Sequence, residues 1–89
     1  MKHPTNVPGW NASLKELADN IAAMRYDKLQ EFLQLLADKI AADSQTDEAR
    51  GRHRLSLALE QISIYLEIAS KDTGHAWDIC KPFMKDTKE

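Results

Sequence analysis

The chain has 89 residues, of which 43% are hydrophobic and 29% are charged, and its formal net charge is -2. This balance is typical of one small folded domain, and it excludes a disordered chain, a strongly basic polyanion binder and a strongly acidic mimic of nucleic acid. Cys80 is the single cysteine, which excludes an intramolecular disulfide and favours a reducing compartment, so we expect a cytoplasmic protein. No apolar run approaches the length of a membrane span, so no membrane association is predicted.

The N-terminal part of the chain is predicted to be an arm followed by a helix. Residues 1–12 contain Pro4, Pro8 and Gly9, which favour an irregular arm. Ser13 and Glu16 have the spacing of a capping box, so a helix is expected to begin after Ser13. Spacings of three and four give this helix one apolar face, formed by Leu14, Leu17, Ala18, Ile21 and Met24.

A break is predicted at about Arg25–Tyr26, because Arg25 and Lys28 would otherwise lie close to that apolar face. Asp27 is expected to cap the second helix. The alternative is one long helix from Ser13 to Asp43, since neither glycine nor proline interrupts the segment. The apolar side of the second helix repeats Leu29, Phe32, Leu33, Leu36 and Ile40. Residues 42–51 are predicted to be a polar connection.

The segment LSLALEQISIYLEIA, residues 55–69, fits either a strand or a helix at first sight. Its alternation of apolar residues shifts phase at Glu60–Gln61, and residues 52–72 contain neither glycine nor proline, so a third helix is predicted, starting between Thr46 and Arg52. Its core face is expected to comprise Leu55, Ala58, Leu59, Ile62, Tyr65, Leu66 and Ala69. Its solvated side is expected to carry Glu60, Ser63 and Glu67.

Other apolar residues of this helix, Leu57, Ile64 and Ile68, fall on a second, narrower stripe. They share it with the polar residue Gln61. Exposed apolar patches usually mark interaction sites, so something is expected to cover this stripe. One hypothesis is that the C-terminal segment folds back over it, and the other is that a second copy of the chain packs there about a two-fold axis. The two hypotheses are about equally supported and can combine. The predicted partner interface consists of Leu57, Gln61, Ile64, Ile68, Trp77 and Phe83.

The C-terminal segment is predicted to contain a stop and a short restart. Gly74 is expected to end the third helix, Thr73 to cap a final helical segment, and Pro82 to limit its regularity. Residues 85–89 form a charged tail. The sequence therefore predicts an all-α protein, a small bundle of three main helices with a short C-terminal helical segment, in a single helical domain over residues 13–84.

The sequence RGRHR contains the strongest local charge, with Arg50, Arg52 and Arg54 as candidate phosphate contacts. Three acidic residues just before it, Asp43, Asp47 and Glu48, would neutralise it locally. No aromatic residue interleaves with the arginines, and the connection is longer than the turn of a helix-turn-helix. We therefore favour solvated surface or protein salt bridges over nucleic-acid binding, which stays the alternative hypothesis.

No catalytic, metal or cofactor site is predicted. His53, His75 and Cys80 lack the spacing of metal ligands, and His75 and Cys80 are five residues apart, so they point about 140° away from each other on a helix. The sequence thus favours a non-catalytic intracellular interaction or regulatory module that acts as a homodimer, with no small-molecule substrate. A small nucleic-acid-binding regulator is the alternative.

Overall fold

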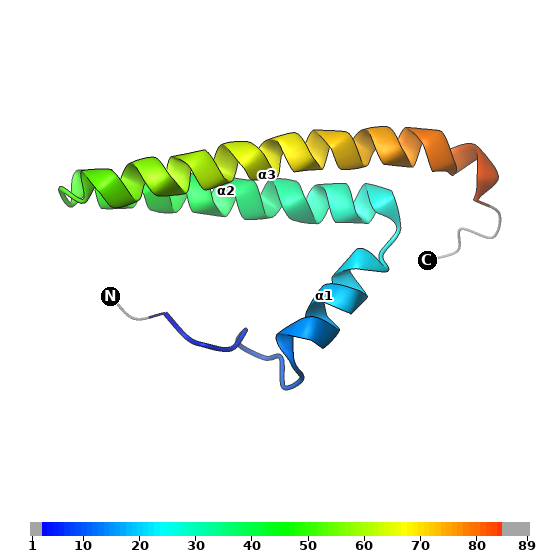
Figure 1. Ribbon diagram of the computed structural model, residues 1–89, viewed down its shortest axis with the longest axis horizontal. Coiled ribbons are helices and arrows are strands. Elements are labelled where there is room, and N and C mark those ends of the chain that lie inside the picture. The colour runs from blue at the N-terminus through cyan, green and yellow to red at the C-terminus, as the bar shows by residue number, and fades with distance from the viewer. Residues whose placement is uncertain (1–2, 85–89) are drawn as a thin grey trace.

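The computed structural model describes residues 3–84, which form three α-helices and one short 3-10 helix and contain no strand. The helices are α1 (Leu14–Ala22), α2 (Tyr26–Ala49) and α3 (His53–Cys80), followed by η1 (Lys81–Phe83). Helices α2 and α3 lie side by side as a long antiparallel hairpin, and α1 leaves the N-terminal end of α2 at an angle (Figure 1). The predicted all-α class, with three main helices and a short C-terminal helical segment, is confirmed. Residues 1–2 and the predicted tail at 85–89 lie outside the described residues.

Small side chains fill the interface between α2 and α3. Ala37 and Ser44 on α2 and Ser56, Ser63 and Ser70 on α3 are buried, and within each helix they are seven residues apart. Seven residues are about two turns, so each set lies on one face of its helix. Because a serine or alanine side chain is short, the two helix backbones can approach closely along this line.

Hydrogen bonds between the helices define a single register. The Ser44 hydroxyl donates to the carbonyl oxygen of Ser56 at 2.7 Å, and the Ser70 hydroxyl donates to that of Gln30 at 2.9 Å. Residue 44 is therefore level with 56, and residue 30 with 70, which places Ala37 level with Ser63. These two bonds join the hairpin near both of its ends.

The row of buried small residues between the helices, here called the serine seam, corrects the predicted core of α3. It comprises Ala37, Ser44, Ser56, Ser63 and Ser70. Ser63 was expected on the solvated side, yet it is buried against α2. Of the seven residues predicted to form the core face, Leu59, Leu66 and Ala69 are half-buried, whereas Leu55, Ala58, Ile62 and Tyr65 are exposed. The larger apolar side chains do not fit between closely spaced backbones, so they take positions on either side of the seam.

The beginning of the helical region follows the prediction in part. Ser13 is the N-cap of α1, and a complete capping box with Glu16 is present. α1 ends at Ala22 and α2 begins at Tyr26, so the predicted break is confirmed and the alternative of one continuous helix is wrong. Asp27 does not cap α2, because its carboxylate instead accepts hydrogen bonds from Arg25 Nε at 2.7 Å and Nη2 at 2.8 Å.

The predicted polar connection is mostly helix. α2 continues to Ala49, so the turn comprises only residues 50–52, and Gly51 adopts the left-handed φ of 79° that a tight reversal after a helix requires. The polar segment stays helical because Ser44 and Asp47 face inward. Ser44 bonds to α3, and the buried Asp47 carboxylate accepts a hydrogen bond from Arg52 Nη1 at 3.0 Å.

Gly74 does not end the third helix, and Thr73 does not cap a new one. α3 continues to Cys80, and the Thr73 hydroxyl donates to the carbonyl oxygen of Ala69, one turn earlier in the same helix, at 2.7 Å. The α-helix ends at Cys80, and Pro82 lies in the 3-10 helix η1 that follows. Trp77 and Ile79 therefore continue the line of α3, and they do not fold back over its apolar stripe.

Candidate interaction surface

Four of the residues predicted to bind a partner share one exposed surface of α3, here called the α3 stripe: Leu57, Gln61, Ile64 and Ile68. On an ideal helix they lie about 100–160° around the axis from Ser63, which faces α2. The exposed fractions of Leu57, Ile64 and Ile68 are 65%, 43% and 51%. Residues 3–84 thus leave the α3 stripe open to solvent.

The other two predicted interface residues lie elsewhere. Trp77 is half-buried at the end of the hairpin, where the Arg25 guanidinium carbon is 5.3 Å from its ring centroid, a cation–π distance. Trp77 therefore links α3 to the junction of α1 and α2. Phe83 is 80% exposed in η1, past the C-terminal end of α3.

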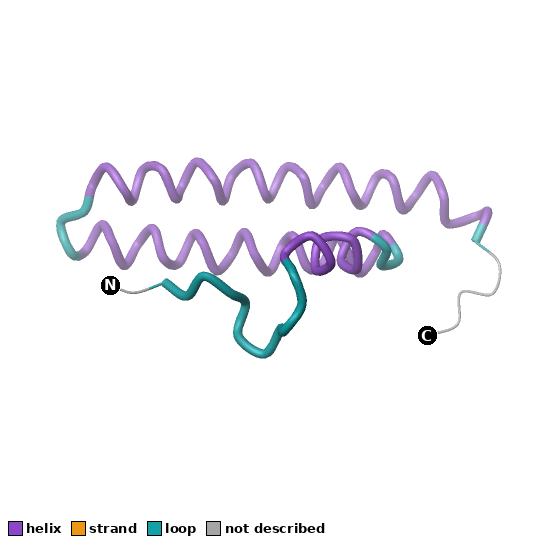
Figure 2. The backbone as a smooth tube through the Cα atoms, turned by 60° about the horizontal axis from the view of Figure 1, so that its bottom comes forward, coloured by secondary structure: helices purple, strands orange, loops and turns teal. Residues whose placement is uncertain are grey.

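A second apolar surface, the hairpin face, lies on the opposite flank of α3. Phe32 and Leu36 of α2 and Leu55 and Ile62 of α3 are all exposed there. All four residues were predicted to belong to the core, so their exposure to solvent was not expected from the sequence. The N-terminal arm approaches part of this face, because His3 lines a cavity of about 290 Å³ whose wall includes Leu55 and Leu59, although Leu55 itself stays exposed. The arm lies on the α2 side of the hairpin and turns away from it toward the start of α1 (Figures 1 and 2).

The basic cluster is partly neutralised within the chain. Arg52 Nη1 lies 3.0 Å from Asp47 Oδ1, and His53 Nδ1 lies 2.7 Å from Glu48 Oε2. Arg50 and Arg54 are exposed. The cluster therefore has fewer hydrogen-bond donors available to a phosphate than the number of its basic residues suggests.

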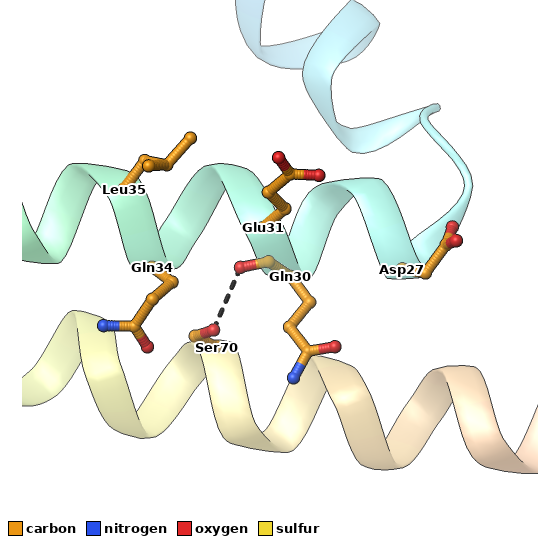
Figure 3. A pocket seen from close by; sticks show the side chains of 6 residues that line it. All are labelled: Asp27, Gln30, Glu31, Gln34, Leu35 and Ser70. Atoms are coloured by element: carbon orange, nitrogen blue, oxygen red, sulfur yellow. Dashed lines mark hydrogen bonds between the residues drawn. The ribbon is translucent and has the colours of Figure 1, made fainter.

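A shallow hollow of about 350 Å³ lies on the α2–α3 surface near the α1 junction, lined by Asp27, Gln30, Glu31, Gln34, Leu35 and Ser70 (Figure 3). The hydrogen bonds and charge of Arg25 hold the pKa of Asp27 below its ordinary value. The Gln30 and Gln34 side chains extend toward α3, whereas Leu35 and Glu31 point away from it (Figure 3). A small-molecule site requires polar groups that converge on one point, and these groups do not.

Metal-ligating side chains are dispersed. No group of three His, Cys, Asp or Glu residues within 3–84 is placed to hold a metal ion. Cys80 Sγ is 3.9 Å from Met84 Sδ, at the C-terminal end of α3. In the same part of the chain, no helix is both long and apolar enough to cross a membrane.

Comparison with known proteins adds no constraint on this surface. Neither a protein-family model, nor a curated protein, nor a solved structure matches the chain.

Proposed function

We propose that this protein is a non-catalytic interaction module that associates with itself through the α3 stripe. The observation that carries the proposal is the exposure of Leu57, Ile64 and Ile68 on one face of α3, in a row that only Gln61 interrupts. Contiguous exposed aliphatic side chains are uncommon on monomers and typical of interaction surfaces. The single cysteine fits a reducing compartment, and we place the module in the cytoplasm on that basis.

The size of the exposed surface supports association. The accessible area is 7093 Å², against about 5,300 Å² expected for a compact monomer of this mass. Among residues 3–84, Ala37 is the one hydrophobic residue that is buried. A chain with so small an interior has much apolar surface left to remove from water by packing against a partner.

The α3 stripe is favoured over the hairpin face because the N-terminal arm already approaches the latter. The cavity lined by His3 and Leu55 lies on the hairpin face, so part of that face is used within the chain. The α3 stripe has no comparable cover from the described residues.

The two surfaces can be separated with a matched pair of substitutions, Ile64→Asp and Ile62→Asp. The two isoleucines are 43% and 44% exposed, but they lie about 160° apart around α3, on the α3 stripe and the hairpin face respectively. An unpaired carboxylate buried at an interface costs several kcal/mol, so Ile64→Asp should convert a dimer to a monomer while Ile62→Asp leaves the dimer intact. Sedimentation equilibrium measures both. A wild-type chain that is monomeric at high concentration, or a dimer lost only in Ile62→Asp, would contradict the proposal.

Nucleic-acid binding is the second candidate, and the exposure of Arg50 and Arg54 favours it. Phosphate contacts release counterions, so such binding would weaken steeply as salt increases. We expect no salt-sensitive binding to duplex DNA in a fluorescence titration at moderate ionic strength. Micromolar binding that is lost when Arg50, Arg52 and Arg54 are all replaced by serine would move this candidate to first place.

A further inference from the structure

We infer that α1 is a lid for the hairpin face. It rotates about residues 23–25 and packs antiparallel to α2, over the apolar side chains that α2 and α3 expose there. Closure converts the open arrangement of Figure 1 into a three-helix bundle. The lid acts within one chain and does not depend on self-association, because the hairpin face and the α3 stripe lie on opposite flanks of α3.

α1 has an apolar face that the open arrangement leaves without a dock. None of its nine residues is buried, Leu14 is 64% exposed, and Leu17 and Ile21 are half-buried. On an ideal helix these three side chains lie within about 60° of one another, so a single contact can cover them all. A helix shorter than about 12–15 residues is marginal in water unless it packs on another element. α1 therefore gains its stability by docking.

The charges of α2 make its outer side, away from α3, a poor dock. Leu35 and Glu31 point to that side (Figure 3), and Lys28 and Lys39 lie on it as well. All four are exposed, so a leucine of α1 placed there would meet charged side chains. The hairpin face is apolar and is formed by two helices, and α1 can contact both of them at once.

The N-terminal segment already meets the flank of α3 that carries the hairpin face. At the open end of the hairpin, the Arg25 guanidinium carbon lies 5.3 Å from the centroid of the Trp77 ring. Near the turn, His3 lines a cavity with Leu55 and Leu59. On an ideal helix Trp77 lies on the same flank of α3 as these two leucines. The joint about which α1 rotates is therefore next to the face that it covers.

The segment between these two contacts is long enough to lie on the face. Trp77 and Leu59 are 18 residues apart in α3, about 27 Å along its axis. The nine residues of α1 cover about 14 Å. Residues 3–12 add up to about 33 Å when they are extended. The segment is therefore slack, which allows α1 to move while His3 stays near the turn.

The length of the joint sets the register of the closed lid. Residues 23–25 connect α1 to α2, just as residues 50–52 connect α2 to α3, where residue 44 is level with residue 56. A reversal of the same length places Leu17 level with Leu29, and Leu14 level with Phe32. Leu33, the next residue, points toward the groove between α2 and α3 on an ideal helix. The apolar face of α1 thus comes to lie over the open end of the hairpin face.

Hydrogen exchange in the full chain tests whether α1 is docked. A nine-residue helix without packing exchanges its amides almost as fast as an unfolded chain. In Ile64→Asp, in which self-association does not contribute, we expect the amides of residues 18–22 to be protected more than about tenfold. Adding Leu17→Ser should remove this protection. The matched variant Asp19→Ser changes a residue about 160° away on α1 and should keep it.

The outcomes separate the lid from the proposed function. Unprotected α1 amides would overturn the lid, and so would protection that Leu17→Ser leaves unchanged. Protection found in the wild-type chain but lost in Ile64→Asp would mean that α1 packs on a second copy, which overturns the lid and leaves self-association standing. Protected α1 amides in a wild-type chain that is monomeric would overturn self-association and leave the lid standing.

Paired cysteines test which side of α2 receives α1. Two double variants are prepared in the full chain carrying Cys80→Ser and Ile64→Asp. One joins Leu14→Cys to Leu33→Cys, beside the hairpin face. The other joins Leu14→Cys to Leu35→Cys, about 160° away on the outer side of α2. A disulfide requires Cα atoms within about 7 Å of each other, so we expect the first pair to close at least about tenfold faster in a glutathione buffer.

The second pair controls for random collision, because its two cysteines are nearly as close in sequence as those of the first. Equal rates would mean that α1 moves without a preferred dock, and faster closure of the second pair would mean that α1 packs on the outer side of α2. A disulfide-linked dimer in place of the intramolecular product would mean that α1 docks on another copy. Each of these results would overturn the lid.

Discussion

Gln30 and Gly74 face each other across the hairpin, and this contact explains why a glycine is present inside α3, six residues before its end. A Cβ atom at position 74 would lie 2.8 Å from Gln30 Cδ and still closer to its Nε2. Glycine inside a helix costs about 1 kcal/mol relative to alanine. The sequence signal for a helix end was therefore misleading here, because the glycine makes room for a side chain from α2.

The substitution Gly74→Ala has two opposing effects, a gain in helix propensity and a steric conflict between the new Cβ atom and Gln30. Its measured stability shows which is larger. The obstructing atoms are the amide end of a flexible side chain, which can rotate away at small cost. We expect Gly74→Ala to stabilise the protein by up to about 1 kcal/mol in urea unfolding, and to reach the full gain when Gln30 is also replaced by alanine. A clear loss of stability in the single variant would mean that Gln30 is held rigidly in its observed position.

At the scale of the elements, the helices could be predicted from local pattern but their ends and inward faces could not. The capping box of Ser13 and Glu16 identified the start of α1, because both partners lie within one turn. The extension of α2 to Ala49 depends on contacts with α3, a helix remote in sequence. The serine seam was missed for a related reason. A hydrophobicity pattern assigns the polar serine to the solvated side, whereas two closely packed helices favour serine for its small volume.

Ser63, at the middle of the seam, allows that interpretation to be tested. Its hydroxyl donates within its own helix, to the carbonyl oxygen of Glu60 at 2.8 Å, so Ser63→Ala removes no contact between the helices and should be nearly neutral. Ser63→Leu adds volume between two close backbones and should cost about 1–3 kcal/mol. Urea unfolding followed by circular dichroism compares the two. Equal stability of both variants would mean that the helices are not closely packed at this position.

At the scale of the whole molecule, helical periodicity grouped Leu57, Gln61, Ile64 and Ile68 correctly on one surface, because periodicity fixes angles within a single helix. It could not place Trp77, whose position depends on where Arg25 ends up after the α1–α2 break. It also could not tell which flank of α3 would pack against α2. The small-residue seam decides that, and it leaves apolar side chains exposed on both sides.

The elongated shape gives the last prediction. The radius of gyration is 15.9 Å, against about 12 Å for a compact domain of this length, so the isolated chain has little interior to stabilise it. A partner that binds only the folded state raises the apparent stability in proportion to the logarithm of its concentration. We therefore expect the Tm of the full chain to rise with protein concentration, and to rise equally in Ile62→Asp. In Ile64→Asp the Tm should be lower and independent of concentration. Scanning calorimetry over a hundredfold range of concentration measures all three, and a wild-type Tm that does not change would mean that the chain folds without a second copy.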